Sequence, residues 1–132
     1  HDIADQLGIA YGDQSWTSTF TDLDNDGDLD LVVANHYSPH IFAENVDGIF
    51  EKREVTSEPL ISFAFQVMSA DFDNDGWLDG FLTYWSEQDY LWYSGGDSTF
   101  AEIAVLANIN GPGSTMFAAS ADFNGDGTAD DA

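Results

Sequence analysis

Three short acidic runs contain the residues of this chain that are best suited to chemistry. Residues 22–30 read DLDNDGDLD, residues 71–79 read DFDNDGWLD, and residues 122–130 read DFNGDGTAD. Oxygen-bearing side chains recur at alternate positions, and glycine stands at the sixth position of each run. Because glycine permits a sharp backbone turn, the alternate side chains can converge on one point. The pattern predicts three compact turns lined by hard oxygen donors.

Such donors are the chemistry of a divalent cation site. Positions 1, 3, 5 and 9 offer side-chain oxygens, and position 7 offers a backbone carbonyl. Ca²⁺ takes roughly six to eight oxygen ligands, whereas Mg²⁺ demands a tighter octahedron, so we expect up to three Ca²⁺ sites. The predicted ligands are Asp22, Asp24, Asp26, Asp30 and the Asp28 carbonyl; Asp71, Asp73, Asp75, Asp79 and the Trp77 carbonyl; and Asp122, Asn124, Asp126, Asp130 and the Thr128 carbonyl.

The runs do not fit a helix–loop–helix calcium site of the EF-hand type. That site needs a bidentate Glu at position 12, where this chain has Val33 and Leu82 inside apolar, strand-like segments. A strand–loop–strand site closed by Asp at position 9 fits better. Four carboxylates on one turn repel each other by roughly 1–4 kcal/mol per close pair, so we expect the cation to hold each turn closed.

Position 8 of each acidic run is apolar. We expect Leu29, Leu78 and Ala129 to point away from the ion and to pin each loop to the core. The role of the ion is then structural rather than signalling, because the sequence predicts no helix pair that calcium could open.

The acidic runs are part of a longer repeat. Their first aspartates are Asp22, Asp71 and Asp122, about 50 residues apart. Short segments of strand length flank the runs, with Gly and Asp turns between them, and no segment shows helical periodicity over three turns. The expected strands are 16–21, 31–34, 41–43 and 50–55 in the first repeat, 63–70, 81–85, 90–93 and 100–105 in the second, and 114–121 in the third.

Four short strands per repeat predict an all-β chain of tandem four-stranded antiparallel blades of the β-propeller type. We expect residues 1–10 to be the end of a preceding blade and its last strand. Repeat 1 then spans 11–60, repeat 2 spans 61–110, and a truncated repeat 3 spans 111–132. About two and a half blades cannot close a ring. Either the chain is a fragment, or a partner completes it, and open blade edges favour self-association.

These motifs resemble the FG-GAP or VCBS-type repeats, such as the calcium-binding blades of integrin α-subunit propellers. The Asp-x-Asp-x-Asp-Gly-x-Leu-Asp pattern, present twice, carries the resemblance, and the third copy departs from it at Asn124, Gly125 and Ala129. The Phe-Gly and Gly-Ala-Pro elements of the family name are absent, so the chain is more similar to the VCBS branch. The resemblance implies a secreted or cell-surface location and an adhesive or scaffold role.

The composition excludes several classes of protein. The 132 residues include 25 Asp and Glu against two Lys and Arg, a net charge of -23, with no Cys. A chain with two cations cannot form the basic face that nucleic acid requires, and it is repelled by anionic membranes. A 43% hydrophobic content is too high for a disordered acidic tail, and no apolar run is long enough for membrane insertion.

Aromatic and histidine residues supply weaker candidates. Trp77, Trp85 and Trp92 could stack on sugar rings, although aromatic residues in strands more often pack between blades. His36 and His40 bracket a predicted turn. They could bind a transition metal, but an ordinary surface hairpin explains them better.

We find no motif of a catalytic nucleophile, metalloprotease or phosphate-binding loop, so we predict no enzyme and no catalytic residue. The favoured function is a non-catalytic, calcium-stabilised repeat segment of an extracellular protein, with a structural or adhesive role in an assembly. Its expected partner is a protein or glycan at the cell exterior. The alternatives are a glycan-binding module and an accessory module of a polysaccharide-acting enzyme.

Overall fold

A computed structural model describes residues 3–54, 64–85, 88–96, 100–102, 115–122, 124–125, 127 and 130–131. Within them the chain forms ten strands and one short helix, so the all-β prediction is confirmed. Of these described residues, no stretch forms a helix long and apolar enough to cross a membrane.

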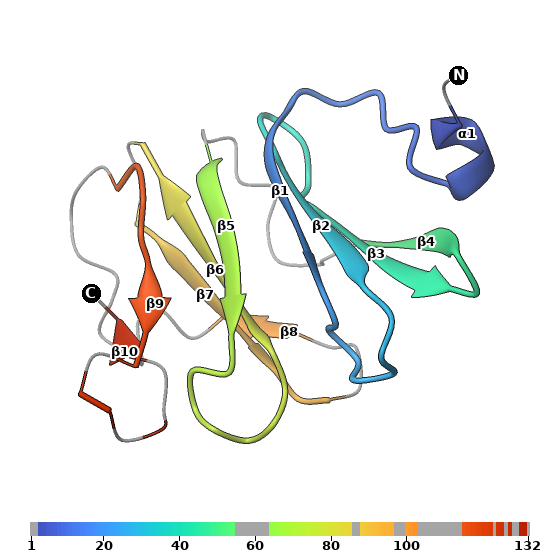
Figure 1. Cartoon of the computed structure of the whole chain (residues 1–132). Coiled ribbons are helices and arrows are strands. Elements are labelled where there is room, and N and C mark those ends of the chain that lie inside the picture. Colours follow the sequence, from blue (N-terminus) through green and yellow to red (C-terminus); the bar gives the residue numbers. More distant parts are fainter. Residues whose placement is uncertain are drawn as a thin grey trace.

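The first repeat folds into one antiparallel sheet whose strands follow chain order (Figure 1). The strands are β1 (Ser15–Thr21), β2 (Asp30–Asn35), β3 (Ile41–Val46) and β4 (Ile49–Glu54). The β3–β4 turn has positive φ at Asp47 (53°) and Gly48 (86°), as a two-residue type I′ hairpin requires. The expected strands of this repeat are therefore present, within a few residues of their predicted bounds.

The second repeat builds an equivalent sheet in the same order. Its strands are β5 (Ala64–Ala70), β6 (Asp79–Tyr84), β7 (Tyr90–Ser94) and β8 (Phe100–Glu102). The register of the first strand pair shifts between Ser15 and Thr17 in β1 and at the equivalent place, between Ala64 and Gln66, in β5. The two repeats thus share even their strand irregularities.

The two ends of the chain differ from the expectation. Residues 1–10 were expected to end a strand, but the described part of this segment forms helix α1 (Ala4–Leu7) and no strand. Helix formation there follows from local hydrogen bonds, in which Gln6 and Leu7 N–H groups donate to the Ile3 carbonyl. In the third repeat, β9 (Ser120–Ala121) pairs with β10 (Asp130–Asp131). The strand β9 is shorter than the strand expected over 114–121.

The sheets pack face to face, with β5 of the second sheet beside β1 of the first (Figure 1). Alternate residues of β2 point to opposite faces. Val32 and Ala34 face the second sheet and share a buried core with residues of β5, β6 and β7, including Leu82 and Trp92. This shared core holds the two acidic loops at the same end of the stack.

The opposite face of the first sheet has its own small core. Leu31, Val33, Ile41 and Ala43 are buried there, and Ile9, Tyr11 and Phe50 pack against them. The segment after α1 therefore covers part of this face.

Candidate metal centre

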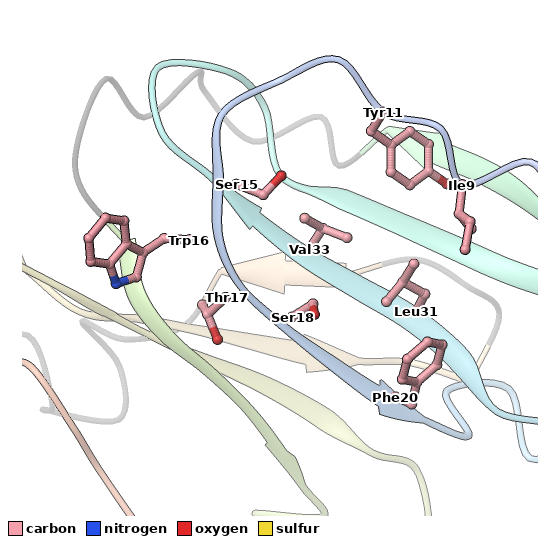
Figure 2. Close-up of a pocket in the computed structure, with 9 residues that line it drawn as sticks. All are labelled: Ile9, Tyr11, Ser15, Trp16, Thr17, Ser18, Phe20, Leu31 and Val33. Carbon is pink, nitrogen blue, oxygen red and sulfur yellow. The ribbon is translucent and has the colours of Figure 1, made fainter. Parts of the chain in front are cut away.

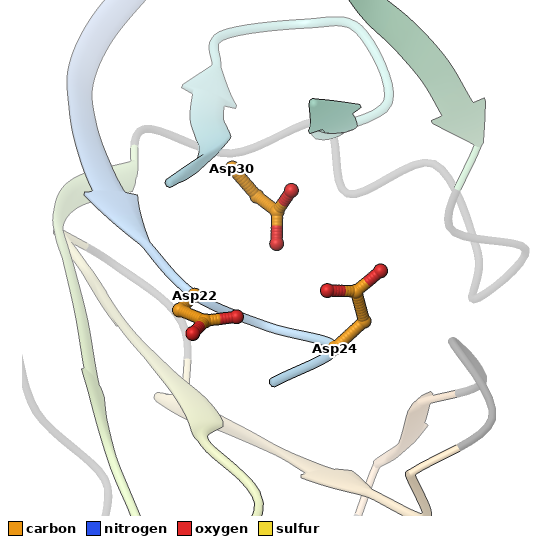
Figure 3. A group of neighbouring side chains, drawn as sticks. All are labelled: Asp22, Asp24 and Asp30. Atoms are coloured by element: carbon orange, nitrogen blue, oxygen red, sulfur yellow. The ribbon is translucent and has the colours of Figure 1, made fainter. Parts of the chain in front are cut away.

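The first acidic loop connects β1 to β2 and brings three of its carboxylates together. One oxygen each from Asp22, Asp24 and Asp30 lies within 4.8 Å of the others. Figure 3 shows the three side chains pointing toward a common centre. These are positions 1, 3 and 9 of the motif, so the predicted convergence is present for these three residues.

Position 9 is the most firmly held member of this group. Asp30 is 2% exposed, and its two oxygens accept hydrogen bonds from the Leu23 N–H at 2.8 Å and the Asn45 N–H at 2.9 Å. Leu23 belongs to the loop itself and Asn45 to β3. Asp30 therefore ties the loop to the sheet in addition to facing the cluster.

The rest of the loop curls around its own carboxylates. The Gly27 N–H donates to Asp22 at 3.1 Å, the Asp26 N–H to Asp24 at 3.2 Å, and the Asp28 N–H to Asp26 at 2.8 Å. Gly27 has a φ of +93°, which side chains rarely allow, so glycine is needed at position 6.

The second loop, between β5 and β6, repeats this geometry. Oxygens of Asp71, Asp73 and Asp79 lie within 4.8 Å of one another. Asp79 is 1% exposed and accepts hydrogen bonds from the Phe72 N–H at 3.0 Å and the Ser94 N–H at 2.9 Å. Since Phe72 and Ser94 correspond to Leu23 and Asn45 of the first repeat, the same anchor is built twice.

The third loop is described in part. The Gly127 N–H donates to Asp122 at 2.8 Å, which matches the bonds from Gly27 and from Gly76 in the other loops. Asn124 is exposed. Asp126, Thr128 and the side chain of Asp130 lie outside the described residues, so this third set of ligands stays a prediction.

Position 5 lies outside both carboxylate groups. Neither Asp26 nor Asp75 belongs to the triads that the described residues form. Asp75 instead accepts a hydrogen bond from the Tyr93 hydroxyl at 3.0 Å and one from the Trp77 N–H at 2.9 Å. The ligand roles of position 5, and of the Asp28 and Trp77 carbonyls, stay predictions.

The electrostatics of the loops favour a cation. Burial raises the pKa of Asp30 and of Asp79, backbone amides partly offset this rise, and neighbouring carboxylates add to it. Burial also raises the pKa of Asp24. The hydrogen bond from the Asp26 N–H partly offsets this rise, and the charges of nearby carboxylates add to it. A bound cation would reverse the effect of these like charges. The Asp75 hydrogen bond, with the charges of Asp73 and Asp75, raises the pKa of Tyr93 to about 12, so this phenol remains a donor.

The hydrogen bonding of one carboxylate oxygen indicates whether a metal ion fits the first loop. Asp22 Oδ1 is buried and accepts no hydrogen bond within the described residues. Leaving a buried carboxylate oxygen without a partner costs free energy, and a cation at the triad would supply the partner. The donor set contains oxygen alone, which Ca²⁺ prefers. The residues present therefore fit a calcium ion.

The expectation for position 8 was wrong at the first loop. Leu29 is 56% exposed, whereas Leu23 at position 2 is partly buried and packs against the core shared by the two sheets. Position 2 is apolar in all three runs, as Leu23, Phe72 and Phe123, and this signal could have identified the anchor. Asn45 and Ser94 were also missed, since no local motif marks them.

The three tryptophans proposed for sugar stacking lie in different environments. Trp92 is 1% exposed and packs against Phe42 in the core, so it offers no free face, which corrects its assignment as a ligand-binding residue. Trp77 is partly buried, with its ring beside Gly96. Trp85 is 45% exposed, and its ring lies 5.5 Å from that of Phe65.

The histidines do not form the surface hairpin that the sequence favoured. His36 and His40 are 4% and 5% exposed, because their turn packs against the second sheet. His40 Nδ1 accepts the Asn35 N–H at 3.1 Å, so the neutral ring carries its proton on Nε2, which bonds the Tyr84 hydroxyl. His40 thus connects the two repeats.

A cavity of about 400 Å³ lies on the other face of the first sheet (Figure 2). Ile9, Tyr11, Phe20, Leu31 and Val33 are among its lining residues, with hydroxyls of β1 at its side. None of the described residues that line it is charged, so they offer no ligand set for a cation. The acidic loops are the site that carries chemistry.

The family comparison agrees with this arrangement. An FG-GAP-like repeat matches the chain twice, over residues 22–82 and 71–130. Each match begins at the first aspartate of a loop, and together they span most of the sequence. The chain therefore belongs to the FG-GAP-like repeat family, whose repeats generally form a non-enzymatic structural fold and are typical of extracellular proteins. No curated protein matches the chain. Membership of the VCBS branch stays a prediction.

Proposed function

We propose that this chain is a non-catalytic, calcium-stabilised repeat module of a secreted or cell-surface protein, with a structural and adhesive role. Ca²⁺ would be held by the Asp22, Asp24 and Asp30 group and by the Asp71, Asp73 and Asp79 group, with a third ion in the loop at 122–130. When bound, the ion supplies positive charge that offsets the repulsion among the carboxylates.

The observation that carries the calcium proposal is the buried Asp22 Oδ1, which has no hydrogen-bond partner within the described residues and belongs to a side chain of the first carboxylate group. The loop is already curled by its own amides, so a cation would complete it without rearranging the sheet. The recurrence of the triad in the second repeat supports the same role there.

The proposed location and role draw on charge and family. A net charge of -23 disfavours anionic partners, and calcium at extracellular concentration would fill sites of this kind. Repeats that stack face to face present many loops on a rigid frame, which suits adhesion to a protein or glycan partner. We also propose that open blade edges allow self-association.

Thermal unfolding in calcium and in chelator tests the proposal. If two sites are filled at about 100 times their Kd, the stabilisation is about 5 kcal/mol, and the Tm should rise by more than about 10 °C. The variant that combines Asp24→Ala with Asp73→Ala removes a ligand oxygen from each loop and should lose most of this rise. Asp47→Asn removes one carboxylate charge from the β3–β4 turn, outside the acidic loops, and should keep the rise. Equal Tm values in calcium and chelator for the unchanged protein would contradict the proposal.

A second candidate, glycan binding, is favoured by the exposed ring of Trp85. Its neighbour Phe65 also contacts Trp16, which is 59% exposed, so the three rings form a row across both repeats. Such rings can stack on sugars. The module could then serve a polysaccharide-acting enzyme. A glycan array run with the unchanged protein and with Trp85→Ala tests this: binding lost in the variant supports it, and an empty array removes it.

A further inference from the structure

A hydrogen bond directly joins the first two acidic loops. The side-chain amide of Asn25, at position 4 of the first loop, donates to the Gly76 carbonyl of the second at 2.7 Å. At the base of the loops, the Ser69 hydroxyl donates to the Thr21 hydroxyl at 2.9 Å. The loops are therefore linked at two levels.

The Gly76 carbonyl belongs to a peptide group that matters for the second loop. The N–H of that same peptide group, on Trp77, donates to Asp75 at 2.9 Å, and the Gly76 N–H donates to Asp71 at 3.0 Å. The next carbonyl along the chain is that of Trp77, the proposed position 7 ligand. Asn25 thus restrains the peptide group that precedes the Trp77 carbonyl, and with it the orientation of this proposed ligand.

Asn25 is equally well connected to the first loop. It follows Asp24, a member of the first triad, and the Asp26 N–H donates back to Asp24 at 3.2 Å. Its φ of +56° lies in the left-handed region, which Asn tolerates better than most residues. Any change that orders Asp24 therefore also orders the donor that reaches the second loop.

We propose that Asn25 couples the two calcium sites, so that calcium in one loop raises the affinity of the other. This inference rests on the proposed calcium binding and adds a regulatory relationship between the sites. Coupling between binding sites is reciprocal, so either loop can help the other. One hydrogen bond, here at a solvent-exposed position, supports a coupling of about two- to tenfold in affinity.

A role for Asn25 as a turn residue alone makes a different prediction. Asn74 occupies the same position in the second loop, with a φ of +62°. Glycine adopts such φ values without strain, so Asn25→Gly keeps the turn and removes only the side-chain donor. If Asn25 served only the turn, this substitution would leave the second loop unchanged.

The test is a calcium titration of ¹⁵N-labelled protein followed by NMR. The Gly27 amide reports on the first loop, and the Trp77 indole N–H reports on the second. Asp24→Ala, which removes a ligand from the first loop, should raise the calcium concentration that half-fills the second loop by about two- to tenfold. Asn25→Gly should do the same. The double variant should show no more than the larger single effect.

Asn74→Gly is the matched control. Asn74→Gly can change the calcium affinity of the second loop, in which it lies. In this background, Asp24→Ala should still lower the calcium affinity of the second loop by the same factor as in the unchanged protein. Circular dichroism of each variant checks that the sheets are retained.

Three results would overturn the coupling. The second loop could bind with unchanged affinity in Asp24→Ala and Asn25→Gly, or the effects of the two substitutions could multiply; in either case calcium binding itself stands. If neither reporter responds to calcium in the unchanged protein, both the coupling and the calcium proposal fail.

Discussion

The Asp30 carboxylate accepts the backbone N–H of Asn45 at 2.9 Å, which ties the first acidic loop to the third strand of its sheet. Asp79 makes the same bond to the Ser94 N–H, also at 2.9 Å, in the second repeat. Because both aspartates are buried, these bonds belong to the fold whether or not an ion is present. Position 9 of the motif therefore has a role in the fold in addition to its proposed role as a calcium ligand.

This dual role predicts different behaviour at positions 9 and 3. An Asn side chain has one acceptor oxygen, so Asp30→Asn can accept only one of the N–H groups of Leu23 and Asn45, and the other faces the amide NH₂. The substitution should lower the free energy of unfolding by about 1–3 kcal/mol even in chelator. Asp24→Asn should change stability in chelator by less than about 0.5 kcal/mol. Urea unfolding in chelator measures both. Equal losses in the two variants would show that Asp30 has no role of its own in the fold.

The position 2 residue is predicted to anchor the loop. Leu23→Ala removes side-chain contacts with the shared core and should cost about 1–3 kcal/mol. Leu29→Ala changes a side chain that is 56% exposed and should stay within about 0.5 kcal/mol. The comparison uses urea unfolding with calcium present. A larger loss for Leu29→Ala would restore position 8 as the anchor.

The buried His40 predicts a pH dependence. Burial, followed by the nearby His36, lowers the pKa of His40 to about 4, from an ordinary value of 6.5. Between these two values the unfolded chain binds more protons than the folded one, so stability is present above pH 6.5 and is lost as pH falls toward 4. The loss from this one group is about 3 kcal/mol.

The measurement is the free energy of unfolding between pH 7 and pH 4 in chelator, which keeps calcium linkage out of the comparison. His40→Gln should be less stable at pH 7 but should lose less stability over this interval than the unchanged protein. An identical pH dependence in the two proteins would contradict the assignment, and so would an NMR titration that gives His40 a pKa near 6.5.

Much of this fold could be predicted from its repeats. The three acidic runs set the register of the strands, because each run must occupy the turn between the first and second strand of a blade. That inference located β1, β2, β5 and β6 to within a few residues. It failed at α1, where local hydrogen bonds to Ile3 form a helical turn that no repeat pattern constrains.

The site was predictable where motif spacing alone sets the geometry. Positions 1, 3 and 9 converge as expected, since alternate residues of a tight turn face one centre. Partners from distant strands were not predictable. Asn45 reaches Asp30, and Asn25 reaches Gly76, only because β3 folds back and the two sheets stack. The burial of His40 has the same origin, since its turn looks like a surface hairpin until the second sheet covers it.

The number of calcium ions bound per chain tests the central claim most directly. Isothermal titration of the chelator-treated protein with CaCl₂ should give at least two ions per chain, and the combined Asp24→Ala and Asp73→Ala variant should lose both. A titration with no calcium-dependent heat, supported by equilibrium dialysis that finds no bound calcium, would contradict the account.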